Sequence, residues 1–296
     1  MREKTGHQDD PFRPKSDLVF LSGMMALGGS YVVLVLCLIV GDALFTTPAE
    51  MWSALATPEI RYSLTLSVIS SSITTILALW VAVPLAYLMS RFHPDHFLLR
   101  RQELHGKNAL QWVRHRSAHY GLLLIDTILD IPLVLPPLVV GVSLLILFSF
   151  APLSAASDWI VYEVPAVIIA QFTVACAFAV RTMRATFDQI PLRQEQVAMT
   201  LGASRSQVFW TVLLPQARRG MVAAATLCWA RAIGEFGPVL IFAGSISMRT
   251  EVLPTTIFLK LEEGNLTAAL SVSVCMILCA IAVLMITRLV GWQRIN

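Results

Sequence analysis

Charged residues are scarce in this sequence: Asp, Glu, Lys and Arg make up only 14% of its 296 residues, whereas 56% are hydrophobic. A soluble domain carries about a quarter charged residues and about half apolar ones. The deficit excludes an ordinary water-soluble fold and indicates a protein that lies in a lipid bilayer. The net charge is only +3, which argues against nucleic acid as a partner.

Cysteine is also scarce, and its placement excludes most cysteine chemistry. The five cysteines all lie within apolar runs, at Cys37, Cys176, Cys228, Cys275 and Cys279. Cysteines in such surroundings act as small hydrophobic residues. Cys275 and Cys279 lie one helical turn apart, but no other soft ligand is near them in the sequence. We therefore predict no metal site and no cofactor.

The sequence also lacks the motifs of nucleotide hydrolysis and of catalysis. No GxxxxGK[ST] stretch occurs, so the chain has no P-loop to cradle nucleotide phosphates. No nucleophile–base pair or metal constellation can be assembled either, which argues against an intramembrane enzyme. We predict that the chain is not an enzyme and that a separate polypeptide supplies any energy from ATP.

Long apolar runs dominate what remains. A run of roughly 20 residues crosses a hydrocarbon core of about 30 Å as a helix, and lipid-facing backbone must be helical to satisfy its polar groups. The third run contains Pro132, Pro136 and Pro137 and is expected to be tilted or broken there. The sequence thus predicts an all-α, polytopic membrane bundle with six transmembrane helices, near 18–40, 63–90, 121–150, 164–182, 220–245 and 267–290.

Basic residues gather in alternate connections between these runs. Only Arg61, Arg249 and Lys260 lie in the other connections. Because cytoplasmic loops are rich in Lys and Arg, we predict that both termini are cytoplasmic. The basic side holds Arg2, Lys4, Arg13, Lys15, Arg91, Arg100, Arg101, Lys107, Arg114, Arg116, Arg181, Arg184, Arg193, Arg205, Arg218, Arg219, Arg288 and Arg294.

This topology divides the chain into three parts and places two connections on the outer side of the membrane. The two outer connections, 41–62 and 246–266, are either short interfacial helices that face an external partner or simple packed loops. The parts are a cytoplasmic leader (1–17), a six-helix transmembrane domain (18–290) with cytoplasmic loops 91–120 and 184–219, and a cytoplasmic tail (291–296).

The loop 184–219 has the local signals of two short helices. Pro191 suits the first turn of a helix over 191–201, and Gly202 suits the left-handed position that ends it. Ser204 is expected to cap the second helix, with Gln207 completing a capping box. An apolar stripe then follows at Val208, Phe209, Val212 and Leu213, and Pro215 is expected to stop this helix.

This loop resembles the cytoplasmic signature of the permeases of ATP-binding-cassette (ABC) importers. That signature is Glu-Ala-Ala, three residues, Gly, nine residues, Ile, one residue and Leu-Pro. In the family, the helical pair inserts into a groove of the ATPase subunit. The resemblance implies a set of ATPase-coupling residues here, namely Glu195, Gln196, Ala198, Gly202, Ala203, Val212, Leu214 and Pro215.

The head of the signature departs from the family pattern. Gln196 stands in place of the usual glutamate, and Val197 in place of an alanine. Glu195 is adjacent, but it lies about 100° away around a helix. We therefore expect docking to depend more on shape, at Ala198 and Gly202, than on charge.

The fifth run contains both an arginine and a glutamate, Arg231 and Glu235. Charges at membrane depth cost about 2.5–3.5 kcal/mol each on insertion scales and usually face a bundle interior or a water-filled path. Their four-residue spacing allows them to pair. Either Arg231 borders the translocation path, or the pair is a structural lock, which we favour. The translocation and gating candidates are Arg231, Gly234, Glu235, Gly237 and Pro238.

Residues 230–244 (ARAIGEFGPVLIFAG), 250–254 (TEVLP) and 130–137 (DIPLVLPP) resemble the molybdate, tungstate and sulfate branch of these permeases. The resemblance implies an inner-membrane permease subunit that imports an oxyanion by alternating access. It also implies as partners an ATPase dimer, a second permease subunit (identical or a sister chain), an extracytoplasmic binding protein and membrane lipid. Ferric iron, thiamine or polyamine import is the alternative cargo, and a self-powered transporter or channel is the alternative class.

The loop 91–120 is longer than this connection usually is in the family. A metal or pH sensor and a basic face lying against anionic lipid headgroups are both compatible with its composition, and six accompanying Lys and Arg residues favour the second. It holds five of the six histidines: His93, His96, His105, His115 and His119.

Overall fold

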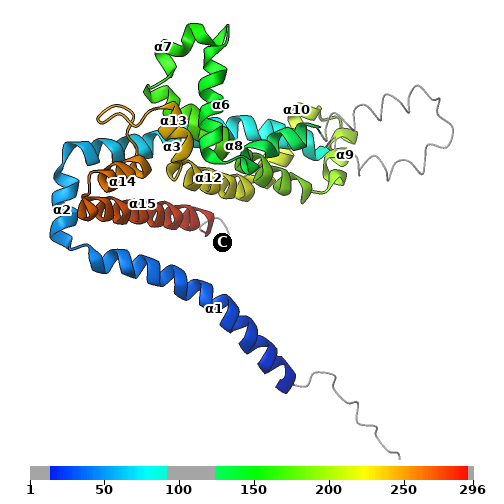
Figure 1. Ribbon diagram of the computed structural model, residues 1–296. Helices are drawn as coiled ribbons and strands as arrows, with labels where there is room; N and C mark the ends of the chain where they lie inside the picture. Colours follow the sequence, from blue (N-terminus) through cyan, green and yellow to red (C-terminus); the bar gives the residue numbers. More distant parts are fainter. Residues whose placement is uncertain (1–13, 92–123, 293–296) are drawn as a thin grey trace, which may run out of the picture. The chain divides into compact units, whose positions relative to one another are not determined.

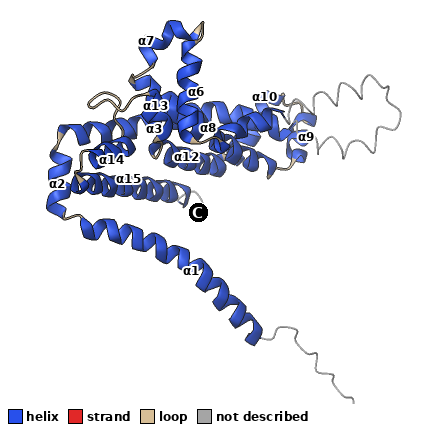
Figure 2. Cartoon of the chain, viewed as in Figure 1, coloured by secondary structure: helices blue, strands red, loops and turns tan. Residues whose placement is uncertain are grey.

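The computed structural model describes residues 14–91 and 124–292, and helices connected by loops make up this part of the chain (Figures 1 and 2). Two compact units divide at Thr47 and Pro48. The described part of the first unit is α1 (Pro14–Phe45) and its short exit. The second unit begins with α2 (Pro48–Ala56), α3 (Pro58–Arg91), the helix Leu124–Val134, α6 (Pro137–Ser149), η2 (Leu153–Ala156), α7 (Ser157–Ile160) and α8 (Val164–Asp188).

The second unit continues through the fifth and sixth apolar runs. Its later elements are α9 (Leu192–Thr200), α10 (Arg205–Val208), the π-helical turn η3 (Phe209–Leu213), α11 (Leu214–Gln216), α12 (Arg218–Ile233), α13 (Gly237–Phe242), α14 (Leu253–Glu262) and α15 (Leu266–Trp292).

The centre of the second unit is the packing of α3, α8 and α12. Small residues fill this contact, and they let the helix backbones approach closely. Ala78 and Ala82 of α3 face Ala175 and Ala179 of α8, and all four are fully buried. Membrane helices gain little from burying large apolar groups, because lipid is equally apolar, so close van der Waals contact holds this core together.

Four helices in the described residues are long and apolar enough to cross a membrane: α3, α8, α15 and the part of α1 from Leu18 to Phe45. The third apolar run forms a bent pair, Leu124–Val134 and Pro137–Ser149, with an angle of 114° between the two helices. This confirms the predicted break at the prolines. Counting the pair as one span gives five, and six spans with cytoplasmic termini remain a prediction.

The fifth run is also interrupted. α12 ends at Ile233, and the helix resumes at Gly237 as α13. The 16 residues of α12 rise about 24 Å at 1.5 Å per residue, which is short of a hydrocarbon core. Gly234 caps α12, and Pro238 lies in the first turn of α13, where its missing N–H costs nothing. The loosening predicted around Gly234, Gly237 and Pro238 is therefore present.

Short elements occupy the two ends of the second unit. α9 and α10 lie at the end where α3 and α8 finish, and α2 and α14 lie at the opposite end (Figure 1). The helices α2 and α14 confirm that the connections 41–62 and 246–266 contain short helices. The connection 151–163 also contains η2 and α7, which the sequence did not indicate.

Candidate functional site

We call the loop 184–219 the candidate docking loop, and its first helix ends as the sequence predicts. α9 spans Leu192–Thr200, and Pro191 precedes it as the N-cap residue. Gly202 has φ +92°, a conformation that strains any residue with a Cβ. The backbone N–H of Gly202 donates to the carbonyl of Met199 at 3.0 Å, and that of Ala203 donates to the carbonyl of Ala198 at 3.2 Å. These bonds satisfy the last carbonyls of the helix.

The second helix begins with the predicted capping box. The Ser204 hydroxyl accepts from the backbone N–H of Gln207 at 3.3 Å, and the Ser204 N–H donates to the Gln207 side chain at 2.8 Å. Two backbone donors at the helix start are thereby satisfied. The turn between the helices is consequently fixed at both of its ends.

The second helix ends one residue after Pro215, close to the predicted stop, and a new helix starts at Arg218. The chain passes from α10 through the π-turn η3 into α11, which contains Pro215, and a turn at Ala217 separates α11 from α12. The N–H of Leu214 donates five residues back to the carbonyl of Phe209. A wide turn of this kind accommodates proline, which has no N–H to donate and whose ring crowds the preceding turn.

The helical pair sorts its residues into an inner and an outer face. Val208 and Leu213 are buried and form the inward part of the predicted apolar stripe, with Phe209 and Val212 half-buried beside them. Glu195 is buried, whereas its neighbour Gln196 is exposed. The other predicted coupling residues lie at the surface or half-buried, at Ala198, Gly202, Ala203, Val212, Leu214 and Pro215.

Two exposed apolar residues on this loop were missed by the sequence analysis. Leu201 is 83% exposed directly before Gly202, and Trp210 is 63% exposed beside the buried stripe. Extending the helical period would have placed Trp210 on the outward side, two positions from Val208. These two side chains are therefore candidates for contact with another protein.

The two interrupted runs cross at the second candidate region. A Cβ added to Gly237 would lie 2.8 Å from the Pro137 Cβ and 3.0 Å from the Leu138 nitrogen. A Cβ added to Gly141 would lie 2.9 Å from the Ile241 Cβ. Glycine on each side thus allows α6 and α13 to touch at backbone distance. We call this contact the glycine crossing.

Arg231 and Glu235 pair with each other just before the glycine crossing. Nη1 of Arg231 lies 2.5 Å from a carboxylate oxygen of Glu235, and the Glu235 side chain is only 1% exposed. The Arg231 side chain is 30% exposed, and its guanidinium lies 5.9 Å from the centre of the Phe178 ring of α8. The pair is formed within one short stretch of chain, and the cation–π contact is what joins it to α8.

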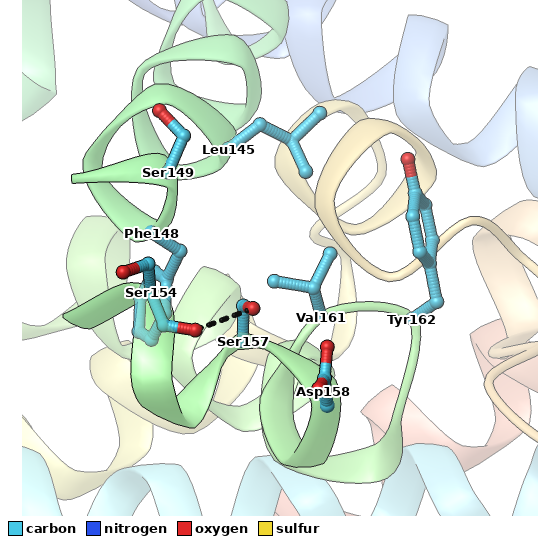
Figure 3. A pocket seen from close by; sticks show the side chains of 8 residues that line it. All are labelled: Leu145, Phe148, Ser149, Ser154, Ser157, Asp158, Val161 and Tyr162. Atoms are coloured by element: carbon cyan, nitrogen blue, oxygen red, sulfur yellow. Dashed lines mark hydrogen bonds between the residues drawn. The ribbon is translucent and has the colours of Figure 1, made fainter. Parts of the chain in front are cut away.

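A hollow of about 370 Å³ opens between the end of α6 and the short elements η2 and α7. In Figure 3, the Ser157 hydroxyl donates to the Ser154 carbonyl at 2.8 Å on one wall of the opening. The lining contains a carboxylate but no cationic side chain, so it does not suit an anion. It consists of Leu145, Phe148, Ser149, Ser154, Ser157, Asp158, Val161 and Tyr162.

Polar contacts hold the connections at the α2 and α14 end of this unit. Arg249 pairs with Glu163, and the Tyr62 hydroxyl donates to the Arg249 carbonyl at 3.0 Å. Lys260 of α14 donates to Glu263 at 2.9 Å. That hydrogen bond raises the pKa of the Lys260 ammonium, which keeps it charged.

The predictions for the histidine-rich loop fall outside the described residues, since His93, His96, His105, His115 and His119 are not among residues 14–91 and 124–292. Within those ranges, no group of three or more His, Cys, Asp or Glu residues is placed to hold a metal ion.

Comparison with known sequences gives a family match and two informative relatives. The family described as binding-protein-dependent transport system inner membrane component matches residues 122–293. The molybdenum transport system permease protein ModB of Mycobacterium tuberculosis is 30% identical over 277 residues, covering 92% of this chain and 94% of ModB. The sulfate transport system permease protein CysT of Salmonella typhimurium is 32% identical over 169 residues, or 55% of this chain. This alignment spans 61% of CysT.

Solved structures share the fold. A chain of the bacterial alginate ABC transporter, in complex with an alginate pentasaccharide-bound periplasmic protein, gives a TM-score of 0.68 at 12% identity, covering 94% of this chain and 96% of that one. A chain of the MetNI methionine ABC transporter gives 0.55 at 17% identity, covering 81% of this chain and 100% of that one. At these identities the likeness concerns the fold alone.

Proposed function

This chain belongs to the family of binding-protein-dependent transport system inner membrane components, and from that membership we propose that it is the permease subunit of an ABC importer. Its cargo is an oxyanion of the molybdate, tungstate or sulfate class. The names of its molybdenum and sulfate permease relatives support this cargo. Its location is a bacterial or archaeal cytoplasmic membrane.

One observation carries the coupling part of this proposal: the turn between the two helices is exposed, whereas residues on the helices beside it are buried. Leu201 and Gly202 are exposed between two capped helices, while buried Glu195 on the first helix and buried Leu213 after the second face the bundle. A rigid, partly apolar projection of this kind suits a groove on another protein. The partner is the ATPase dimer, and the assembly also contains a second permease subunit, identical or sister, and an extracytoplasmic binding protein.

The glycine crossing is the proposed gating region. The breaks at Leu135–Pro136 and Gly234–Phe236 lie next to contacts between Gly237 and Pro137. Packed interiors switch between discrete arrangements instead of deforming continuously, so a change of angle at one break must be matched at the other. Arg231 and Glu235 lie directly before this contact. We propose them as the structural lock favoured above, joined to α8 through Phe178, and we propose Gly234, Gly237 and Pro238 as the gating residues.

The test is affinity purification of the chain in mild detergent, identification of the co-purifying proteins and reconstitution of the complex with them. We expect an ATPase to co-purify and ATP-dependent uptake of at least one of molybdate, tungstate and sulfate. Uptake of ferric iron, thiamine or a polyamine in place of all three would contradict the cargo. Transport driven by an ion gradient without any ATPase would contradict the class.

A further inference from the structure

Arg91, the last residue of α3, has a buried side chain. In the sequence, Arg91 is one of the basic residues on the side predicted to be cytoplasmic. Its side chain is 6% exposed and turned inward, although an arginine at a helix end normally extends its charge into water. An inward arginine at this point calls for partners that compensate its lost hydration.

The partners of Arg91 come from two different elements. Its Nε pairs with a carboxylate oxygen of Glu195 in α9. Its Nη1 donates to the carbonyl of Phe187 at 3.1 Å, and its Nη2 donates to the carbonyl of Ile190 at 3.2 Å. These two carbonyls lie at the C-terminal end of α8, where a cation is favoured. One planar guanidinium therefore joins the ends of α3 and α8 to the docking loop.

Aromatic side chains close over this pair. The Tyr87 hydroxyl lies 3.5 Å from the second carboxylate oxygen of Glu195, and the Tyr87 ring lies 5.1 Å from that of Phe209. The Phe187 ring lies 5.9 Å from the Tyr87 ring and 6.4 Å from the Phe209 ring, so the three rings form one cluster. A buried pair of this kind gives little net stability, but the removal of one partner leaves the other charge uncompensated.

Further polar contacts extend from the Arg91 site to the bent third run. The Ser90 hydroxyl donates to Asp188 at 2.5 Å, which ties α3 to the end of α8 a second time. Arg184, one turn earlier in α8, pairs with Asp126 of the helix Leu124–Val134 at 2.6 Å. The end of α8 thus contacts α3 through Ser90 and Arg91 and contacts the first half of the broken run through Arg184.

We propose that Arg91 is a positioning residue for coupling: it transmits movement of the docking loop to α3 and α8 through Glu195 and the α8 carbonyls. This inference rests on the proposed function, since it presupposes a partner ATPase that moves the loop. It also gives Glu195 a role inside the permease, whereas the exposed Gln196 is on the face that meets the ATPase.

The first experiment measures coupling in the reconstituted complex with its ATPase and binding protein. For Arg91→Ala we expect ATP hydrolysis within about twofold of the parent complex but uptake of molybdate or sulfate per ATP reduced by about tenfold. Arg91→Lys should recover part of the loss, since it keeps the charge but cannot reach all three partners at once. A parallel fall of hydrolysis and uptake would indicate mere destabilisation and overturn the proposal.

The matched control is Arg181→Ala. Arg181 also pairs with a carboxylate, Asp130 at 2.6 Å, but the Arg181 side chain is 59% exposed. An exposed pair contributes little, so uptake per ATP should change by less than about twofold. A loss as large as that of Arg91→Ala would show that any arginine at this end is equivalent, which the proposal excludes.

A second experiment needs no ATPase and therefore separates this inference from the proposed function. Arg193 and Arg205 are exposed on the docking loop and offer trypsin sites in the purified full chain. Freed from Arg91, the loop should open more often, and Arg91→Ala and Glu195→Gln should both speed cleavage there, by about tenfold for the former. Unchanged cleavage in both variants overturns the proposal. If the parent chain neither binds an ATPase nor transports, the proposed function fails, while this assay still decides whether Arg91 holds the docking loop against α3 and α8.

Discussion

The docking loop and the glycine crossing are two contact regions of this protein that are held by different interactions. At the docking loop, separate elements are joined by a charged side chain, caps and aromatic rings, with Arg91 in contact with both α8 and α9. At the glycine crossing, α6 and α13 touch through the absence of side chains at Gly141 and Gly237. Ion pairs and hydrogen bonds fix the relative orientation of the elements at the docking loop, whereas close backbone packing without side chains forms the glycine crossing.

The two arginine–glutamate pairs show the same contrast. Arg91 and Glu195 are 104 positions apart, and both side chains are less than a tenth exposed. Arg231 and Glu235 are four positions apart, and only the glutamate is fully buried. The first pair can hold helices together, whereas the second neutralises charge within one segment. Mutations in the two regions should therefore change uptake, coupling to ATP hydrolysis and the unfolding midpoint in different ways.

The largest effect is expected from Gly237→Leu at the glycine crossing. The Cβ alone would lie 2.8 Å from the Pro137 Cβ and 3.0 Å from a backbone nitrogen, neither of which can move without shifting α6. Overpacking costs about 1–3 kcal/mol per site, and backbone contact places this site at the upper end. We expect loss of uptake together with a lower thermal unfolding midpoint in detergent.

The control for that variant lies three residues away. A Cβ on Gly234 would meet its nearest atoms at 3.6 and 3.8 Å, which is ordinary contact. Gly234→Ala should therefore unfold within a degree or two of the parent, whereas Gly237→Ala should have a clearly lower unfolding midpoint. A loss of about 1 kcal/mol shifts the midpoint by several degrees in a small domain and by less in a larger one. Equal midpoints for the two alanine variants would contradict the glycine crossing.

The next largest effect is expected at the docking turn. Gly202→Asp places a charged side chain on the exposed turn and strains a residue at φ +92°, at a cost of about 1–3 kcal/mol. We expect ATP hydrolysis to continue while uptake per ATP falls. Gly202→Ala carries a similar strain without the charge or the bulk, so its uptake separates backbone strain from obstruction of the docking surface. An aspartate variant that couples normally would refute the role of this turn.

Local signals explain how much of the docking loop could be predicted. The resemblance to ABC importer permeases is confirmed by the family match. The left-handed Gly202 and the Ser204–Gln207 capping box are also confirmed, because caps and turns depend on a few adjacent residues. The helix also ends near Pro215 as predicted, but the π-turn before the proline was not predicted, because a proline alone does not reveal such a turn.

Contacts between distant residues set the limit of the sequence analysis. The pairing of Arg91 with Glu195 joins two segments across the second unit, and no periodicity or spacing indicates it. The meeting of Gly141 with Ile241 is equally remote along the chain. The sequence did predict the glycines and prolines that break the third and fifth runs, but only the fold shows that these breaks touch.

A smaller effect distinguishes the two members of the membrane pair. Arg231→Gln leaves the Glu235 carboxylate buried without its cation, whereas Glu235→Gln leaves an arginine that is 30% exposed and can be hydrated. Stranding a buried charge costs about 3–5 kcal/mol in the most buried cases, and the partial exposure of Arg231 reduces this figure. We therefore expect Arg231→Gln to lower the unfolding midpoint more than Glu235→Gln. The opposite order would show that Arg231 is the member that the fold cannot leave unpaired.

The smallest effect is expected at Gln196. A variant there tests whether docking depends on a polar contact at the exposed surface in addition to the buried pair of Arg91 and Glu195. Gln196 is exposed, and exposed substitutions away from special contacts change stability by within about 0.5 kcal/mol. Gln196→Ala should leave the unfolding midpoint unchanged and reduce uptake by less than about twofold. Leu201→Asp places a charge on the most exposed apolar residue of the turn, so we expect it to weaken ATPase binding in a pull-down. A severe loss of coupling in Gln196→Ala would mean that a polar contact at this position, and not the shape of the turn, governs docking.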